Sequence, residues 1–160
     1  MTLKPEPTPI EEPKSDPVEI SILEDIFYLG YTTSKKITIF NDEEKKIKVN
    51  VVFRTLMPVE FRDIFETVGK YDTYQAQEIV NIIETLARSI QTINDMPLAL
   101  DQKDKEDYEK LNKKAPTPLD QAREILTNKI KSAQVLDALF EEYNKFYDGV
   151  KEQFKDIKKK

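Results

Sequence analysis

The stretch VVFRTLMPVEFRDIFE, residues 51–66, changes its hydrophobic pattern at Pro58. Before the proline, Val51 and Phe53 fall on one side of an alternating pattern, as in a half-buried strand. After it, apolar residues recur at helical spacing, namely Phe61, Ile64 and Phe65. A proline cannot continue a strand inside a sheet, but it suits the first turn of a helix. The stretch therefore predicts a junction at which a strand leads directly into a helix.

We expect Arg54, Thr55 and Pro58 to form a structural corner at this junction. Because successive side chains of a strand point to opposite faces, Arg54 should point away from the buried face. The chain is net acidic and has no phosphate-binding loop, so a carboxylate is the expected partner of the guanidinium. An acid such as Glu60 or Asp63 would fix the angle between strand and helix. The alternative is that Arg54 pairs across an interface.

The residues before the junction predict a β-hairpin at about 35–56. The runs KKITIF, residues 35–40, and KIKVNVVF, residues 46–53, flank the polar stretch NDEEK at 41–45. Two alternating runs separated by a short polar stretch are typical of a hairpin. One face of this hairpin should be buried, and the other should carry lysines into water.

The N-terminal residues predict an extended arm followed by a short helix. Residues 1–17 contain five of the nine prolines, and such a segment buries too little apolar surface to fold alone. It is either a disordered tail without a role or a docking arm, with Pro5, Pro7 and Pro9 as candidate partner contacts. Residues 18–31 are mostly apolar and predict a short helix that ends near Gly30.

Several helices are expected after the junction. The first covers residues 58–68 and ends at Gly69. The second, capped by Thr73, should continue to about residue 95. The first should turn inward Phe61, Ile64, Phe65 and Val68, and the second Ala76, Ile79, Val80, Ile83, Leu86, Ala87 and Ile90. Residues 101–116 are densely charged and predict a solvated loop or a frayed helix.

The C-terminal part predicts two more helices. One restarts at Thr117 and Pro118, and the last is a long helix over residues 133–157 with an aromatic stripe. Phe140 and Tyr143 are expected in the core. The far end of this helix is a candidate partner interface, comprising Phe146, Tyr147, Phe154 and Ile157.

The expected fold class is therefore α+β and mainly α, with an N-terminal extended arm, one β-hairpin and a bundle of three to five helices. Residues 1–17 would form the arm, and residues 18–160 a single domain.

Composition argues against an enzyme. The 160 residues contain no histidine and no cysteine, which removes the commonest general base, the thiol nucleophile and the commonest transition-metal ligands. Three glycines cannot supply a phosphate-cradling loop. Neither acidic run, 41–44 or 101–107, has the ligand spacing of a calcium loop. We expect no catalytic residue, no cofactor and no metal.

Charge and hydropathy indicate a protein partner. The formal net charge of −5 disfavours binding to a nucleic-acid backbone. No stretch of eighteen apolar residues predicts a membrane span, and the absence of cysteine is usual in a reducing compartment.

Three stretches carry a family resemblance: VNVVFRTLMPVEFRDIFE at 49–66, LARSIQTINDMPL at 86–98 and ILTNKIKSAQVLDALFEEYNKF at 125–146. Taken together, they resemble small tail-assembly and baseplate-hub proteins of tailed bacteriophages. The matching residues are Phe53, Arg54, Thr55, Leu56 and Pro58, then Leu86, Ala87, Ile90, Ile93, Asn94, Pro97 and Leu98, then Val135, Asp137, Leu139, Phe140 and Tyr143. Asp95 stands where a glycine would turn more easily, and the proline-rich arm is not part of the pattern.

The resemblance implies a mainly helical adaptor without catalysis. Such a protein is either a chaperone that keeps tail components soluble or a minor component of the tail end. It would contact other tail or baseplate proteins, with self-association left open, in the virion tail or in the host cytoplasm during assembly. The alternative is a cytosolic helical adaptor or chaperone unrelated to phage, which binds peptides or helices in a groove.

Overall fold

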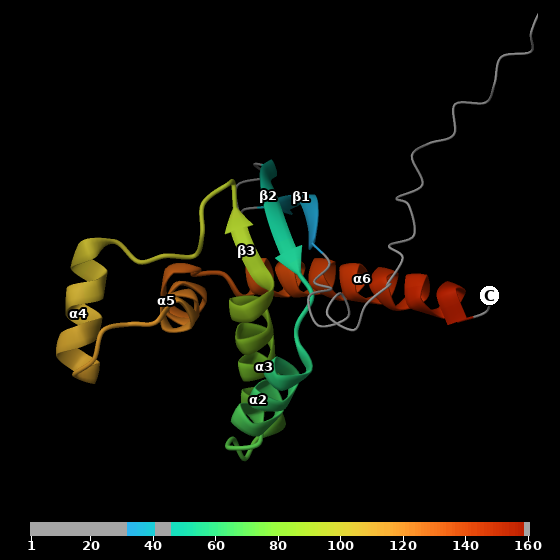
Figure 1. Ribbon diagram of the computed structural model, residues 1–160. Coiled ribbons are helices and arrows are strands. Elements are labelled where there is room, and N and C mark those ends of the chain that lie inside the picture. The colour runs from blue at the N-terminus through green and yellow to red at the C-terminus, as the bar shows by residue number, and fades with distance from the viewer. Residues whose placement is uncertain (1–31, 41–45, 159–160) are drawn as a thin grey trace, which may run out of the picture.

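The computed structural model describes residues 32–40 and 46–158 (Figure 1). The expected arm with Pro5, Pro7 and Pro9, and the expected helix ending near Gly30, lie outside the described residues. The elements run in the order β1 (Thr32–Phe40), β2 (Lys46–Arg54), α2 (Pro58–Val68), α3 (Tyr74–Ser89), β3 (Ile90–Ile93), α4 (Gln102–Asn112), α5 (Pro118–Glu124), the π-helical turn η1 (Ile125–Lys129) and α6 (Ala133–Lys158). The prediction of a mainly helical α+β fold is confirmed.

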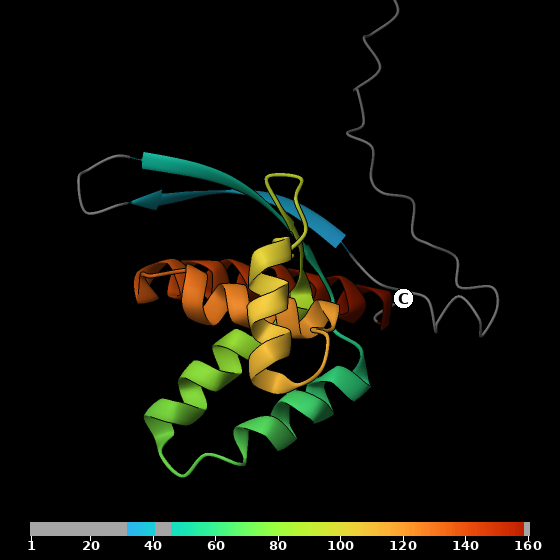
Figure 2. The same cartoon turned by 90° about the vertical axis from the view of Figure 1, so that its left-hand side faces the viewer.

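The sheet contains the predicted hairpin and one further strand. All neighbours are antiparallel, in the order β1-β2-β3, and Thr32 of β1 pairs with Arg54 of β2. The hairpin arches over α6, and the α2–α3 pair lies on the other side of that helix (Figures 1 and 2). On the buried face of the hairpin, Ile37, Val51 and Phe53 are almost inaccessible to solvent.

Strand β3 corrects the prediction of an uninterrupted helix to residue 95. Helix α3 ends at Ser89, and the chain then pairs with β2 through a β-bulge between Val52 and Phe53. Asn94 and Asp95 have φ values of 50° and 65°, which forms the tight turn after β3. Asn94 also accepts a hydrogen bond from Asn50 N–H at 2.9 Å through its side chain. Residues 90–93 therefore form a strand instead of continuing the helix, because they can pair with the open edge of β2 and are followed by this turn.

The starts of the predicted helices are confirmed, whereas three predicted inward residues are exposed. Pro58 occupies the first turn of α2, and Thr73 caps α3 by accepting a hydrogen bond from Ala76 N–H at 3.2 Å. However, Phe61 and Phe65 of α2 are 39% and 80% exposed, and Ile79 of α3 is 57% exposed. The two helices meet along only part of the expected apolar stripes.

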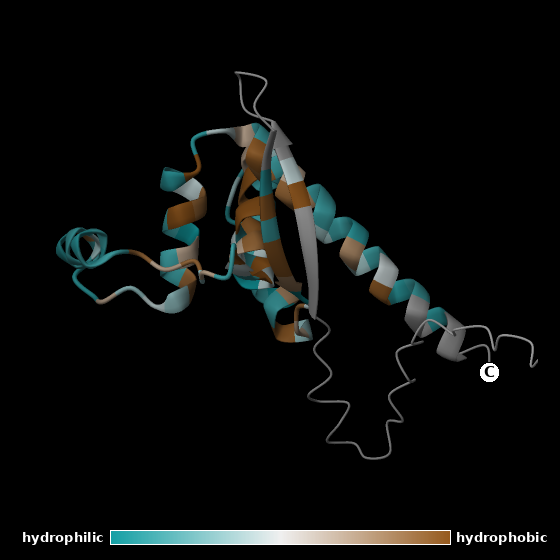
Figure 3. Ribbon diagram, turned by 90° about the horizontal axis from the view of Figure 1, so that it is seen from above, coloured by the Kyte–Doolittle hydropathy of each residue, from teal (hydrophilic) through white to brown (hydrophobic). Residues whose placement is uncertain are grey.

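The charged segment predicted as a loop or a frayed helix near 101–116 contains the regular helix α4. Asp101 caps it by accepting a hydrogen bond from Asp104 N–H at 2.8 Å, and Lys113 ends it in the left-handed conformation. No residue of α4 is buried, and the helix stands apart from the sheet as a hydrophilic rod (Figures 1 and 3). End caps therefore stabilise a helix that has no apolar face of its own.

Helix α6 joins the sheet to the α2–α3 pair. Its residues pack against α3 and β1, and Tyr143 and Phe146 lie against the ring of Phe53. The buried apolar residues that form this core are Ile37, Val51, Phe53, Leu56, Ile64, Ile82, Leu86, Ala87, Ile90, Ala122, Leu126, Leu139, Tyr143, Phe146 and Val150.

Candidate functional site

The corner after β2 is held by a two-bond ion pair. Arg54 donates from Nη1 to Glu60 Oε2 at 2.9 Å and from Nη2 to Glu60 Oε1 at 2.5 Å. Glu60 also accepts from Met57 N–H at 2.8 Å, just before Pro58 begins α2. One carboxylate thus binds both the strand end and the helix start. Of the two acids expected to pair with Arg54, the structure selects Glu60, since Asp63 forms its ion pair with the exposed Arg62.

The ionisation of this pair follows from its surroundings. Burial raises the pKa of Glu60, but the hydrogen bonds from Arg54 and from Met57 N–H outweigh it, so that the pKa lies below its ordinary value. The hydrogen bond to Glu60 raises the pKa of Arg54. Both groups are therefore charged at neutral pH. An ionised carboxylate of lowered pKa is a weak proton acceptor, which suits pairing better than general-base chemistry.

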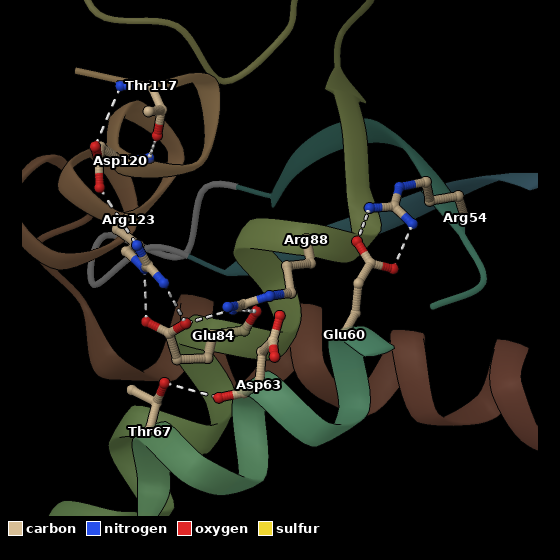
Figure 4. A network of polar contacts seen from close by, with 9 residues as sticks. All are labelled: Arg54, Glu60, Asp63, Thr67, Glu84, Arg88, Thr117, Asp120 and Arg123. Atoms are coloured by element: carbon tan, nitrogen blue, oxygen red, sulfur yellow. Dashed lines mark hydrogen bonds and ion pairs between the residues drawn. The ribbon is translucent and has the colours of Figure 1, made fainter. Parts of the chain in front are cut away.

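A second polar network joins α3 to α5 (Figure 4). Glu84 accepts from Arg123 Nε at 2.7 Å and from Arg123 Nη2 at 2.9 Å, and it also binds Arg88 one turn along α3. The side chains of Glu84 and Arg88 are only 8% and 7% exposed. Arg123 in turn contacts Asp120 at 3.3 Å, which caps α5 together with Thr117. The charges at this helix contact are thus buried in mutual pairs.

Glu84 has a lowered pKa for the same kind of reason as Glu60. Burial raises the pKa of its carboxyl, while the hydrogen bonds from Arg123 and Arg88 lower it by more. The network was not predicted from the sequence. Glu84 and Arg88 stand four residues apart, which puts them on one helix face, but Arg123 is 39 residues away and carries no local signal.

The two networks border a hollow of about 430 Å³, here called the charged cleft. Its lining residues are Arg54, Glu60, Asp63, Ala87, Arg88, Ile90, Gln91, Pro97, Leu98, Pro118, Leu119 and Ala122. Its volume lies within the range of small-molecule pockets, about 300–1,000 Å³. Both lining guanidiniums, however, already donate to carboxylates. An incoming anion would have to displace Glu60 or Glu84 from a short ion pair, so the arrangement favours a structural role.

A second hollow, here called the apolar groove, lies along α2 and α3 and has a volume of about 510 Å³. Its lining residues are Phe61, Ile64, Phe65, Val68, Tyr74, Gln77, Glu78, Asn81, Ile82 and Phe140. Two of its aromatic rings are largely exposed, Phe65 at 80% and Tyr74 at 74%. The groove was not predicted from the sequence, because the helical spacing of Phe65 indicated a core position.

The candidate partner interface at the end of α6 requires a correction. Phe146 is only 7% exposed and stacks on Phe53, so it belongs to the core and offers no free surface. Tyr147 is half-buried between Phe61 and Tyr143, with Lys151 over its ring at 4.4 Å. Phe154 and Ile157 lie in the last turns of α6, and their side chains are outside the described part of the chain. The aromatic stripe therefore packs inward farther than its position in the sequence indicated.

Comparison of the chain with protein-family models, with curated proteins and with solved structures gives no match. Within residues 32–40 and 46–158, no helix has the length and apolar character needed to cross a membrane. The same residues contain no group of three or more acidic side chains placed to hold a metal ion.

Proposed function

We propose that the protein is a non-enzymatic tail-assembly or baseplate-hub protein of a tailed bacteriophage, acting through contacts with other tail or baseplate proteins. The proposal rests on the sequence resemblance. The observation that carries it is that the three resembling stretches meet in space. Phe53 of the first packs against Tyr143 of the third with ring centroids 6.0 Å apart. Asn94 of the second donates from its N–H to the Asn50 carbonyl at 2.7 Å.

In this chain, the three stretches therefore belong to one structural unit. The first stretch builds the strand-to-helix corner, the second builds the end of α3 with β3 and its turn, and the third is the helix packed beneath both. The fold of this unit therefore depends on contacts between residues that are far apart in the sequence.

The edge strand β1 is the surface that we assign to partner binding. It has nine residues, and the strand order places it at one side of the sheet with its outer edge facing away from β2. A strand from another protein could extend the sheet there through main-chain hydrogen bonds. The loop end of the hairpin reaches beyond the helices (Figure 2).

The proposal is tested in infected cells and on purified particles. A tagged chain should recover other tail proteins from infected-cell lysate. Co-sedimentation with particles would identify a built-in component, and recovery from lysate alone would identify a chaperone. The substitution Thr38→Asp, at an exposed position of β1, should weaken this recovery roughly tenfold, because a charge on an edge strand opposes strand addition. Lys110→Asp on the exposed α4 is the control. Recovery of no tail protein by the unmodified chain would overturn the proposal.

The alternative is a cytosolic helical adaptor unrelated to phage, and the apolar groove is the observation that favours it. Amphipathic helices bind such grooves through side chains at helical spacing. This alternative would be supported if the tagged chain recovered host proteins from uninfected cells and did not co-sediment with particles. Phe65→Asp in the groove should then abolish recovery, whereas Thr38→Asp should leave it unchanged.

A further inference from the structure

We infer that residues 18–31 of this chain, VEISILEDIFYLGY, occupy the apolar groove between α2 and α3. The inference does not depend on the proposed function. Nine of these fourteen residues are apolar or aromatic, namely Val18, Ile20, Ile22, Leu23, Ile26, Phe27, Tyr28, Leu29 and Tyr31. A segment of this composition gains free energy when its side chains leave water.

The groove offers a matching surface. On α2, Phe61, Ile64, Phe65 and Val68 follow helical spacing along one wall, and Tyr74, Gln77, Glu78, Asn81 and Ile82 of α3 form the other wall. Phe140 of α6 contributes to the lining. A channel between two helices fits a third element whose apolar residues also have helical spacing. Leu23, Ile26 and Phe27 have this spacing in the segment.

The entry point of the chain brings the segment to the groove. Residue 31 directly precedes Thr32, which pairs with Arg54 across the sheet. Arg54 binds Glu60 in the first turn of α2, and the next residue, Phe61, already lines the groove. The segment is therefore attached beside the N-terminal end of α2, where one wall of the groove begins.

The length of the segment is sufficient. Neighbouring strands lie about 5 Å apart, and the connection from Arg54 to Pro58 spans at most about 13 Å. The eleven residues of α2 extend about 16 Å further. Fourteen residues reach up to about 46 Å when extended and about 21 Å as a helix. As an extended chain, the segment can therefore reach the far end of α2, which is at most about 34 Å away. As a helix, it is longer than α2 itself and can lie along most of the groove.

Tethering favours this segment over a second copy of the chain. A short tether holds an attached segment at an effective concentration of about a millimolar. A free second copy at micromolar concentration competes poorly with it for the same surface. When the segment is bound, the rings of Phe65 and Tyr74 become part of an interior.

Cross-linking of the full chain tests the inference directly, because the natural sequence has no cysteine. One variant combines Ser21→Cys with Glu78→Cys, which is an exposed position in the groove wall. The control combines Ser21→Cys with Glu109→Cys on the outward α4. A short bifunctional maleimide should link the first pair within one chain, with a yield independent of protein concentration, and should leave the control unlinked. Links between two chains would overturn the inference in favour of a second copy, and equal yields in both variants would overturn it outright.

Protection from chymotrypsin provides a second readout. Phe65 and Leu111 are matched exposed apolar residues, at 80% and 84%, but only Phe65 lines the groove. Cleavage after Phe27 or Tyr28 should be slow in the unmodified chain and roughly tenfold faster in Phe65→Asp, with no change in Leu111→Asp. Rapid cleavage of the unmodified chain, or equal rates in both variants, would contradict occupancy of the groove by residues 18–31.

Discussion

The charged cleft and the apolar groove are both lined by α2 and α3, yet they differ in which side chains are buried. At the cleft, Glu84 and Arg88 are more than nine-tenths buried although they carry charges. In the groove, Phe65 and Tyr74 are mostly exposed although they are aromatic. The difference shows that partners decide burial. A charge can be buried where its neighbours pair with it, and an apolar ring stays exposed until another segment covers it.

The largest effect is expected from breaking the buried network of the cleft. Glu84→Gln removes the charge that Arg88 and Arg123 share, which leaves a buried guanidinium without an ionic partner. The free energy of unfolding should fall by about 3–5 kcal/mol. Urea unfolding followed by circular dichroism measures this loss. Glu78→Gln, at an exposed position of the same helix, is the control and should change stability by less than about 0.5 kcal/mol. Equal losses in the two variants would show that the cleft is no more stabilising than the groove wall.

Acid should weaken the cleft by a smaller amount, since a protonated carboxyl can still accept a hydrogen bond. The pKa values of Glu60 and Glu84 lie below the ordinary value of 4.5 in the folded protein. Their contribution to stability is therefore fully present above pH 4.5 and is lost as the pH falls through the folded pKa values. Urea unfolding between pH 3 and pH 7 (about four pH units, spanning the carboxyl range) should show this decline. Glu84→Gln should have a shallower decline; an unchanged slope would mean that Glu84 does not titrate with folding.

Arg54→Lys should have the next largest effect, because it keeps the charge at the corner but loses one of two parallel hydrogen bonds. Lysine cannot reproduce the planar geometry that binds both oxygens of Glu60. A loss of about 1–2 kcal/mol in the free energy of unfolding is expected. Arg62→Lys is the matched control, since Arg62 is exposed and contacts Asp63 at 3.4 Å. If both substitutions have the same effect, the corner does not depend on the paired geometry.

Local chemistry was enough to predict much of the fold. The pattern change at Pro58, the caps at Thr73 and Thr117, and the alternation in the hairpin each depend on residues close in sequence. The expected carboxylate partner of Arg54 was also only six residues away. These features are stabilised largely within their own segments, and so a single sequence reveals them.

Features set by distant partners were not predictable in the same way. Strand β3 depends on the open edge of β2, and the burial of Glu84 depends on Arg123, which is 39 residues further along. The helical pattern of α2 correctly identified the helix, but it could not show that α3 and α6 leave Phe65 uncovered. The same limit explains why Phe146 was expected at an interface, although Phe53 buries it.

The smallest change in stability is expected at Tyr143, whose side chain combines an apolar ring with a buried polar group. Its ring is 3% exposed and packs like the core beneath the groove, while its hydroxyl has no hydrogen-bond partner within residues 32–40 and 46–158. Burial, followed by the nearby Tyr147 and Glu60, raises the pKa of this hydroxyl. Tyr143→Phe keeps the ring contacts and should stabilise the protein by about 0.5–1 kcal/mol. Tyr147→Phe, one turn further along α6 and less buried, should have little effect.

Urea unfolding of the Tyr143→Phe variant separates the two ways in which burial arises in this molecule. A gain in stability would mean that the hydroxyl is buried only because its aromatic ring is buried. It would then lack the polar partner that buried groups have in the charged cleft. A loss of about 1 kcal/mol would mean that the hydroxyl has a partner in the folded protein. Repeating the measurement with residues 1–31 removed would then decide where that partner lies, because a loss that disappears with the deletion places it in the N-terminal segment.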